Sequence, residues 1–258
     1  MGASALAKRN HFETATATEL QKGQQKKKPS CPTRFGRRAC PQNVKSHVLL
    51  SKVNNHLIKI HMARKEIKDF YFYKAKRNHY LARSVYKLKE IDEKYHLLKK
   101  NDVVLDLGCH PGSWLQYCSK VIGPKGMILG IDLKELDHKL GDNVRFLKAD
   151  ILDLNIRTIK SMVNKDFGVV LSDMAPFTTG AKFVDHERSM RLARRSLEIA
   201  DQVLRKAGNF LCKILEGEES HAFPKEVRER FGFMKIYKPK GSRKESREIY
   251  VIGLGKRP

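Results

Sequence analysis

Short apolar runs alternate with longer amphipathic stretches from about residue 62 to the end of the chain. The first run, Val103–Leu107, stops on a glycine and is typical of a strand buried on both faces of a parallel sheet. Similar runs follow at residues 127–131, 144–147, 167–171, 209–212 and 249–252. Together these runs predict the strands of one sheet.

The stretches between the runs show helical periodicity. Residues 80–94 place Val85, Leu88 and Ile91 on one face of a predicted helix. The longest helix is predicted from about residue 185 to 205, ended by Lys206-Ala207-Gly208. This alternation predicts an α/β fold with a doubly wound parallel sheet, whose ligands bind at the carboxyl ends of the strands.

Residues 1–61 differ from the rest of the chain. They hold 12 Lys and Arg but only two acidic residues, and they show no sustained periodicity. Three interpretations stay open: a disordered basic tail, an organellar transit peptide, or an extension that precedes a true start at Met62. We expect a cytoplasmic protein, or a mitochondrial or plastid one if the segment is a transit peptide. Residues 62–258 are then the folded domain.

The net charge favours a polyanionic partner. The 52 Lys and Arg against 28 Asp and Glu give +24, which attracts nucleic acid by neutralising phosphates. An anionic membrane is the alternative, but no apolar run approaches the ~20 residues needed to span one. The five cysteines form no C-x-x-C pair, and their odd number argues against a disulfide framework. We predict a monomer in a reducing compartment, without a metal site or membrane partner.

A glycine-bearing turn follows the first predicted strand. Gly108 and Gly112 allow the backbone to approach a ligand closely where a strand turns into a helix. The pattern is not G-x-G-x-x-G, and Pro111 lacks the N–H that a phosphate-binding loop would offer. A nucleoside cofactor without phosphates is therefore favoured over a dinucleotide.

Aspartates at the ends of successive predicted strands support such a cofactor. Asp132 is placed to accept hydrogen bonds from ribose hydroxyls, and Asp150 to accept one from the exocyclic amine of adenine. These needs are those of S-adenosylmethionine. The alternative is that strand-end aspartates only cap the helices that follow.

Four separated segments have the order and spacing of one known family. They read ARSVYKL (82–88), DLGCHPGSWLQ (106–116), SDMAP (172–176) and SREIY (246–250). Through them, about residues 66 to 256 resemble the FtsJ/RrmJ (RlmE) ribosomal RNA ribose 2′-O-methyltransferases. The resemblance implies a mostly parallel, seven-stranded sheet of the Rossmann-like class I methyltransferase type, and S-adenosylmethionine as the cofactor. It makes residues 62–258 the methyltransferase domain.

The resemblance also assigns site residues. A catalytic Lys-Asp-Lys-Glu tetrad falls on Lys87, Asp173, Lys213 and Glu248. The cofactor-binding positions fall on Gly112, Trp114, Asp132, Asp150 and Asp173. Taken alone, each tetrad residue also fits a structural role, such as a solvated helix face for Lys87 or a turn cap for Asp173.

The expected chemistry explains the need for two lysines and two carboxylates. A ribose 2′-hydroxyl must lose its proton while its oxygen is aligned with the methyl group. We expect Lys213 to be the base, or to orient the oxygen lone pair. Burial and Lys87 favour loss of its proton, whereas Asp173 and Glu248 favour its charged form, so its protonation state stays open. Lys87 and Glu248 are expected to tune the charge and hold the ribose.

Three residues depart from the family pattern or adjoin the cofactor turn. His110 replaces a small residue, and we expect it to contact the cofactor rather than act as a base. Phe177 stands at a commonly polar position, where it either stacks on an RNA base or only packs. Cys109 is expected to be a small packing residue.

Two basic segments are predicted to contact RNA. They are residues 64–83, where Lys and Arg alternate with tyrosines, and residues 235–247, which include Lys238, Lys240, Arg243 and Lys244. The predicted function is methyl transfer to a ribose of large-subunit ribosomal RNA, in the assembled subunit and on a uridine. The alternatives are transfer to transfer RNA or an mRNA cap, and a non-catalytic ribosome-assembly factor that binds RNA.

Overall fold

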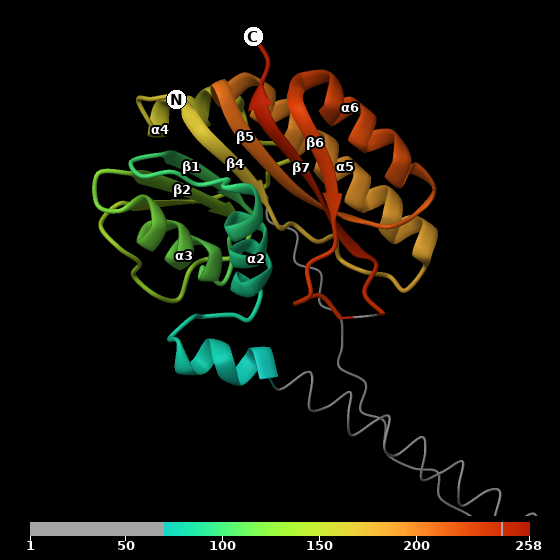
Figure 1. The fold of residues 1–258 in the computed structure, drawn as a ribbon, viewed down its shortest axis with the longest axis horizontal. Helices are drawn as coiled ribbons and strands as arrows, with labels where there is room; N and C mark the ends of the chain where they lie inside the picture. The colour runs from blue at the N-terminus through green and yellow to red at the C-terminus, as the bar shows by residue number, and fades with distance from the viewer. Residues whose placement is uncertain (1–69, 244) are drawn as a thin grey trace, which may run out of the picture. The chain divides into compact units, whose positions relative to one another are not determined.

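The computed structural model describes residues 70–243 and 245–258 (Figure 1). The predicted leader, residues 1–61, lies outside the described residues, as does the proposed boundary near residue 62. Lys244 of the second basic segment also lies outside them.

The described residues build one seven-stranded sheet in the order β3-β2-β1-β4-β5-β7-β6. The strands are β1 (Val103–Leu107), β2 (Met127–Asp132), β3 (Val144–Lys148), β4 (Phe167–Ser172), β5 (Leu204–Leu215), β6 (Phe231–Tyr237) and β7 (Glu248–Lys256). Neighbours from β3 to β5 pair in parallel, whereas β7 is antiparallel to both β5 and β6. The predicted doubly wound, mostly parallel sheet of the Rossmann-like class I type is confirmed.

Helices cover both faces of this sheet (Figure 1). Helices α2 (Val85–Tyr95) and α3 (Ser113–Ile122) pack on one face, and residues 70–77 are also helical. Helices α4 (Ile156–Met162), α5 (Lys182–Val203) and α6 (Ala222–Arg230), with the short 3-10 helix η1 (Glu218–His221) before α6, follow along the chain. Apolar side chains of α4, α5 and α6 pack on the other face.

Strand β1 shows why the central strands could be recognised. All five of its residues are buried. Leu105 and Leu107 join the core under α4, α5 and α6, whereas Val104 joins the core under α2 and α3. Because successive side chains of a strand point to opposite faces, a strand covered on both sides must be apolar at nearly every position.

Several predicted boundaries were wrong. The helix expected from Tyr80 begins at Val85. Residues 206–208 do not end a helix but lie inside β5, where Ala207 takes a φ of 59°. The run 249–252 belongs to β7, which is antiparallel rather than parallel. Strand β6 was not predicted from the apolar pattern because it is an edge strand with mostly exposed positions, so it lacks a continuous apolar run. Within the described ranges, no helix combines the length and apolarity needed to cross a bilayer.

Candidate active site

The sheet brings together the tetrad residues that the sequence separates. Strands β4 and β5 are neighbours, with Ser172 paired to Cys212, so Asp173 follows β4 beside Lys213. Glu248 begins β7, which runs antiparallel along β5. The fourth residue, Lys87, comes from α2.

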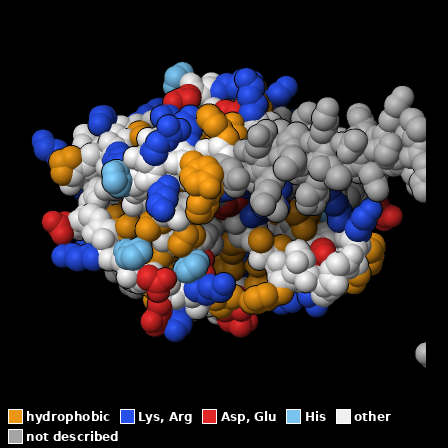
Figure 2. Space-filling model, turned by 90° about the horizontal axis from the view of Figure 1, so that it is seen from below, with side chains coloured by type: hydrophobic (Ala, Val, Ile, Leu, Met, Phe, Trp, Pro, Cys, Tyr) orange, Lys and Arg blue, Asp and Glu red, His pale blue; other side chains and the backbone are white. Residues whose placement is uncertain are grey.

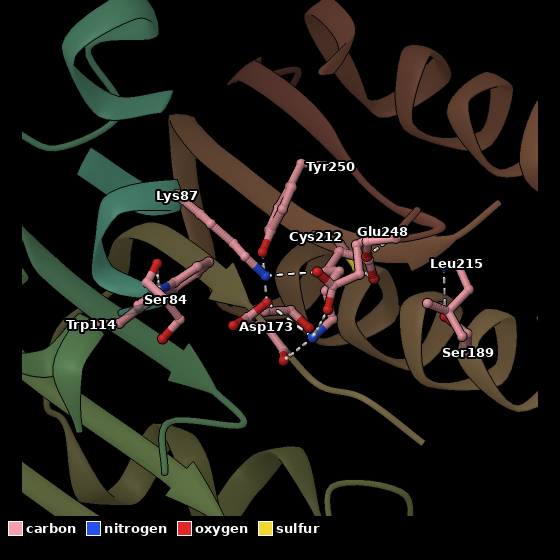
Figure 3. A network of polar contacts seen from close by, with 12 residues as sticks. Ser84, Lys87, Trp114, Asp173, Ser189, Cys212, Leu215, Glu248 and Tyr250 are labelled. Carbon is pink, nitrogen blue, oxygen red and sulfur yellow. Dashed lines mark hydrogen bonds and ion pairs between the residues drawn. The ribbon is translucent and has the colours of Figure 1, made fainter. Parts of the chain in front are cut away.

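All four side chains join one network of polar contacts. The Nζ of Lys87 lies 2.7 Å from Oε2 of Glu248. The Nζ of Lys213 donates to the backbone carbonyl of Asp173 at 2.7 Å, and lies 3.0 Å from Oδ1 of Asp173. It also lies 3.8 Å from Oε1 of Glu248, so Glu248 connects the two lysines. Figure 3 shows Lys87, Asp173 and Tyr250 pointing toward one another.

Burial makes these contacts energetically important. The side chain of Lys213 is only 5% exposed and that of Asp173 16%. Charges removed from water are tolerated when opposite charges and hydrogen bonds surround them, and here two lysine side chains face two acidic ones. Burial alone would raise the pKa of Glu248, but the charge and hydrogen bond of Lys87, with the charge of Lys213, lower it below its ordinary value. Glu248 is therefore an anion at neutral pH.

Tyr250 is a fifth member of the network that the sequence reasoning missed. Its hydroxyl donates to Oδ1 of Asp173 at 2.8 Å. Burial, together with the nearby charges of Asp173 and Glu248, raises its pKa well above the ordinary value, so it stays a neutral donor. A signal was available: Tyr250 lies two residues after Glu248, on the same face of one strand, and pairs with Lys213 across the sheet.

A cavity of about 440 Å³ opens beside the ends of β1, β2, β3 and β4. Apolar side chains form much of its wall, and the carboxylate residues Asp132 and Asp150 also line it. Gly108 and Met174 line it next to Asp173. Two of the three predicted cofactor acids, Asp132 and Asp150, thus share one cavity, while Asp173 precedes the lining residue Met174.

Both cavity aspartates also bind backbone. Asp132 accepts the N–H of His110 through Oδ2 at 2.9 Å and that of Lys134 through Oδ1. Asp150 accepts the N–H of Leu152 at 2.9 Å. Loop capping is therefore one role of these carboxylates. Because each carboxylate accepts about four hydrogen bonds, both keep capacity for a ligand in the cavity.

Two other predicted cofactor positions, Gly112 and Trp114, lie outside the lining of this cavity. Gly112 precedes α3 with a φ of 105°, a conformation that favours glycine. The Trp114 side chain is buried, donates to the carbonyl of Ser84 at 3.1 Å and lies against the ring of Tyr250. Neither residue is among the described residues that line the 440 Å³ cavity. The Trp114 ring thus connects α3 to the start of α2, and its cofactor role stays a prediction.

His110, Phe177 and Cys109 all lie at or next to the residues of this cavity. Phe177 lines the cavity mouth and is 78% exposed, so the alternative that it only packs is wrong. His110 is half-buried and meets Asp132 through its backbone. Cys109 is buried against Gly130, as a packing residue would be.

Asp106, a buried carboxyl beside the site, was not among the predicted site residues. It lies fully buried on β1, and both of its oxygens lack a hydrogen-bond partner among the described residues. Burial and the charges of Asp173 and Asp132 raise its pKa well above the ordinary value. Its surroundings therefore favour the neutral carboxylic acid over the carboxylate.

A second cavity, of about 470 Å³, lies on the Lys87 side of the network. Its lining residues are charged or polar: Arg83, Lys87, Arg243, Glu245, Ser246 and Glu248. The network thus lines this cavity through Lys87 and Glu248 and approaches the first one through Asp173. Figure 2 shows hydrophobic side chains gathered in a hollow on the underside of the molecule, with Lys and Arg side chains around it.

Residues 80–256 match the model of the family described as FtsJ-like methyltransferase. The chain belongs to this family. It is therefore a methyltransferase, and the match covers both cavities and every tetrad position.

Individual relatives agree with the family match. A Syntrophobacter fumaroxidans protein named Ribosomal RNA large subunit methyltransferase E is 45% identical over 188 residues, which cover 73% of this chain and 95% of that protein. A protein of the same name from Desulforapulum autotrophicum is 46% identical over 189 residues, covering 73% of this chain and 93% of that protein. A Plasmodium falciparum crystal structure, described as that of a ribosomal RNA methyltransferase, superposes with a TM-score of 0.61 at 32% identity. It covers 69% of this chain and 98% of its own.

Proposed function

We propose that this protein transfers a methyl group from S-adenosylmethionine to a ribose 2′-hydroxyl of large-subunit ribosomal RNA, on a uridine. The observation that carries the proposal is the buried Lys-Asp-Lys-Glu network, placed between a nucleoside-sized cavity and a charged one. Relatives named for large-subunit ribosomal RNA support the choice of substrate, because this chain spans nearly their whole length.

The residues of the 440 Å³ cavity fit the proposed cofactor. Apolar walls, including Ile131 and Leu152, suit an adenine ring, while Asp132 and Asp150 offer acceptors for ribose hydroxyls and the adenine amine. These acceptors suit a nucleoside. The cofactor supplies a methyl group already activated on a positively charged sulfur, so the protein must supply alignment and proton removal.

Lys213 is the group best placed to act on the hydroxyl proton. Its Nζ is nearly enclosed and lies within hydrogen-bond distance of two oxygens, both of Asp173, while Oε1 of Glu248 is 3.8 Å away. An entering hydroxyl can therefore take the third position at Nζ without displacing Asp173. In one role, a neutral Lys213 accepts the hydroxyl proton. In the other role, a charged Lys213 donates to the hydroxyl oxygen and aims its lone pair. The geometry is compatible with both roles.

The other network members hold Lys213 and the ribose in place. Asp173 fixes the ammonium by two different oxygens, and Tyr250 fixes the carboxylate of Asp173. Glu248, kept anionic by Lys87, balances the second positive charge of the site. In this arrangement Lys87 and Glu248 are the residues nearest to the ribose, because they line the charged cavity.

RNA contact is assigned to the basic segments and to Phe177. Lys238, Lys240 and Arg243 are exposed before β7, next to the charged cavity that Arg243 lines. Phe177 presents an exposed ring on which an unpaired base can stack. Residues 64–69 of the first segment lie outside the described residues. A cytoplasmic location and a monomeric state stay predictions.

Transfer of a labelled methyl group tests the proposal. The full chain would be incubated with labelled cofactor and, in separate reactions, assembled large subunits, naked ribosomal RNA, transfer RNA or capped mRNA, and each product digested to nucleosides. We expect label on the 2′-oxygen of one uridine, with assembled subunits the better substrate. Label on transfer RNA or on an mRNA cap instead would favour the alternative enzymes. RNA binding without transfer would favour the assembly-factor alternative.

A further inference from the structure

Glu90 connects the helix that carries Lys87 to the loop between β6 and β7. Its Oε1 accepts the hydroxyl of Tyr237 at 2.7 Å. Both of its oxygens accept the backbone N–H of Lys240, at 3.1 and 2.9 Å. Glu90 lies one turn after Lys87 on α2, so one helix face holds both a tetrad residue and the start of the loop.

Residues 239–241 of this loop lie against α2. Pro239 and Gly241 are buried, and a β-carbon on Gly241 would lie 3.7 Å from Cγ of Lys87. The hydrogen bond to Glu90, with burial, raises the pKa of Tyr237 to about 12. Tyr237 is therefore a neutral donor at working pH, and the contact with Glu90 does not switch off near neutrality.

A second attachment fixes the other end of the same loop. Arg247 donates to the carbonyl of Glu216, which follows β5, and to that of Lys182 at the start of α5. Between the two attachments the loop places Arg243, Glu245 and Ser246 in the wall of the 470 Å³ cavity. The position of Arg243 thus depends on contacts that do not involve Arg243 itself.

Arg83 lies opposite in the same cavity. Burial lowers the pKa of Arg83, and the charge of Arg243 lowers it further, although Glu248 acts in the other direction. Two guanidinium groups are therefore near each other at the rim of a cavity that also exposes Lys87. Guanidinium groups bind phosphate through paired hydrogen bonds, and a bound phosphate would relieve the repulsion between them.

We propose that Glu90 is a positioning residue for substrate RNA: by holding the loop at Lys240, it sets Arg243 opposite Arg83 so that the cavity takes an RNA phosphate beside the target ribose. This inference rests on the proposed function for the identity of the RNA. Glu90 touches neither substrate nor cofactor in this account. Its effect reaches the substrate through the loop.

The test compares Glu90→Ala, which removes both acceptor oxygens, with Arg243→Gln and the double variant in the full chain, with naked large-subunit ribosomal RNA as the probe. Each single variant should raise the KM for RNA about tenfold with kcat nearly unchanged, and should flatten the salt dependence of binding by about one phosphate contact, a slope change of roughly 0.7–0.9. The double variant should lose little more than either single one, because both remove the same contact.

Matched variants separate positioning from a general structural effect. Glu93→Ala removes a carboxylate from the same helix that forms an exposed ion pair with Lys89, at 3.7 Å, and should leave KM and the salt slope unchanged. Tyr237→Phe keeps the Lys240 contact and should shift both quantities less than Glu90→Ala does, in the same direction. Cofactor affinity and the melting temperature report on folding of each variant.

An unchanged salt slope for Glu90→Ala, or additive losses in the double variant, overturns the positioning role. A lower melting temperature with a wild-type slope does so as well, because it shows a structural role alone. The two proposals can fail separately. RNA binding by the wild type without methyl transfer contradicts the proposed function alone, whereas normal transfer by Glu90→Ala at wild-type KM contradicts this inference alone.

Discussion

Lys213 places its ammonium nitrogen 2.7 Å from the backbone carbonyl oxygen and 3.0 Å from the carboxylate of Asp173. Both contacts follow from the parallel pairing of β4 with β5, because Ser172 and Cys212 are in register immediately before them. The sheet therefore fixes the lysine by two different atoms of one residue. A site of this kind is preorganised, which keeps the cost of aligning a hydroxyl with the methyl donor low.

Tyr250→Phe tests the support that this lysine receives through Asp173. The change removes one hydrogen bond to a charged group and leaves the ring in place. We expect kcat to fall by about tenfold, equivalent to ~1.4 kcal/mol, because Asp173 loses its fixed orientation. Steady-state kinetics measures the effect. Tyr95→Phe, at the end of α2 and outside both the network and the basic segments, is the control, and a wild-type kcat for Tyr250→Phe would remove Tyr250 from the site.

Glu248→Gln should change the acid stability of the protein. The pKa of Glu248 is lowered in the folded state, so its ionisation stabilises the fold above the ordinary value of about 4.5, and that contribution is lost as the pH falls through the folded-state value. The variant should be less stable than wild type at neutral pH, and the gap should close below about pH 4.5. Denaturant unfolding across pH measures this gap. Glu229→Gln on the exposed surface of α6 should show none, and a constant gap for Glu248→Gln would contradict the assignment.

Asp106→Asn should have the opposite pH dependence. The pKa of Asp106 is raised in the folded state, so the unfolded chain loses its proton first, and wild-type stability falls as the pH rises above about 3.8. An asparagine does not titrate. The difference between the melting temperature of the variant and that of the wild type should therefore shift in favour of the variant as the pH rises toward neutrality. A gap that stays constant with pH would show that Asp106 is ionised in the fold.

Asp92→Asn provides the contrast for that experiment. Asp92 is buried like Asp106, but its carboxylate accepts the N–H of Leu98 and the hydroxyl of Tyr117, each at 2.9 Å. Removing one acceptor oxygen leaves a buried donor without its partner, which costs about 1–3 kcal/mol. This variant should be destabilised at neutral pH.

Phe177→Ala tests the stacking assignment. The side chain is 78% exposed, so its removal should leave the melting temperature nearly unchanged. Loss of one stacked base should weaken RNA binding by about 1–3 kcal/mol, measured by titration at fixed salt. Phe233→Ala is the control, since Phe233 is a half-exposed ring on β6 that lines neither cavity of the site. Equal effects of the two variants would show that Phe177 has no special contact.

How far the sequence could predict the fold depended on burial. Strand β1 was found with its correct bounds because both of its faces are covered, which forces a continuous apolar run. Strand β6 has only one neighbour, and its outward positions are free to be polar, so it left no such run. Residues 206–208 were predicted to end a helix, but they lie inside β5, where Ala207 has a positive φ. A glycine beside such a residue occurs both at helix ends and at irregular points of a strand, so the pattern alone did not separate the two.

The site was predictable only where family spacing added to local chemistry. Lys87 and Glu248 are ordinary surface residues by pattern, yet they form a 2.7 Å pair across 161 positions of sequence. Asp106 and Tyr250 lie in recognised motifs, but their roles depend on burial, which short motifs do not report. The contacts of Trp114 with the carbonyl of Ser84 and the ring of Tyr250 were likewise not visible in the motif, and its cofactor role stays a prediction.

The most direct test of the central claim is single-turnover methyl transfer by Lys213→Ala, with cofactor affinity measured on the same preparation. The account predicts that transfer to ribosomal RNA slows by about 10²–10⁴-fold, while binding of S-adenosylmethionine stays close to that of the wild type. Lys165→Ala, at an exposed lysine, should transfer normally. Substantial turnover by Lys213→Ala, with intact cofactor binding, would contradict the assignment of Lys213 as the residue that acts on the hydroxyl.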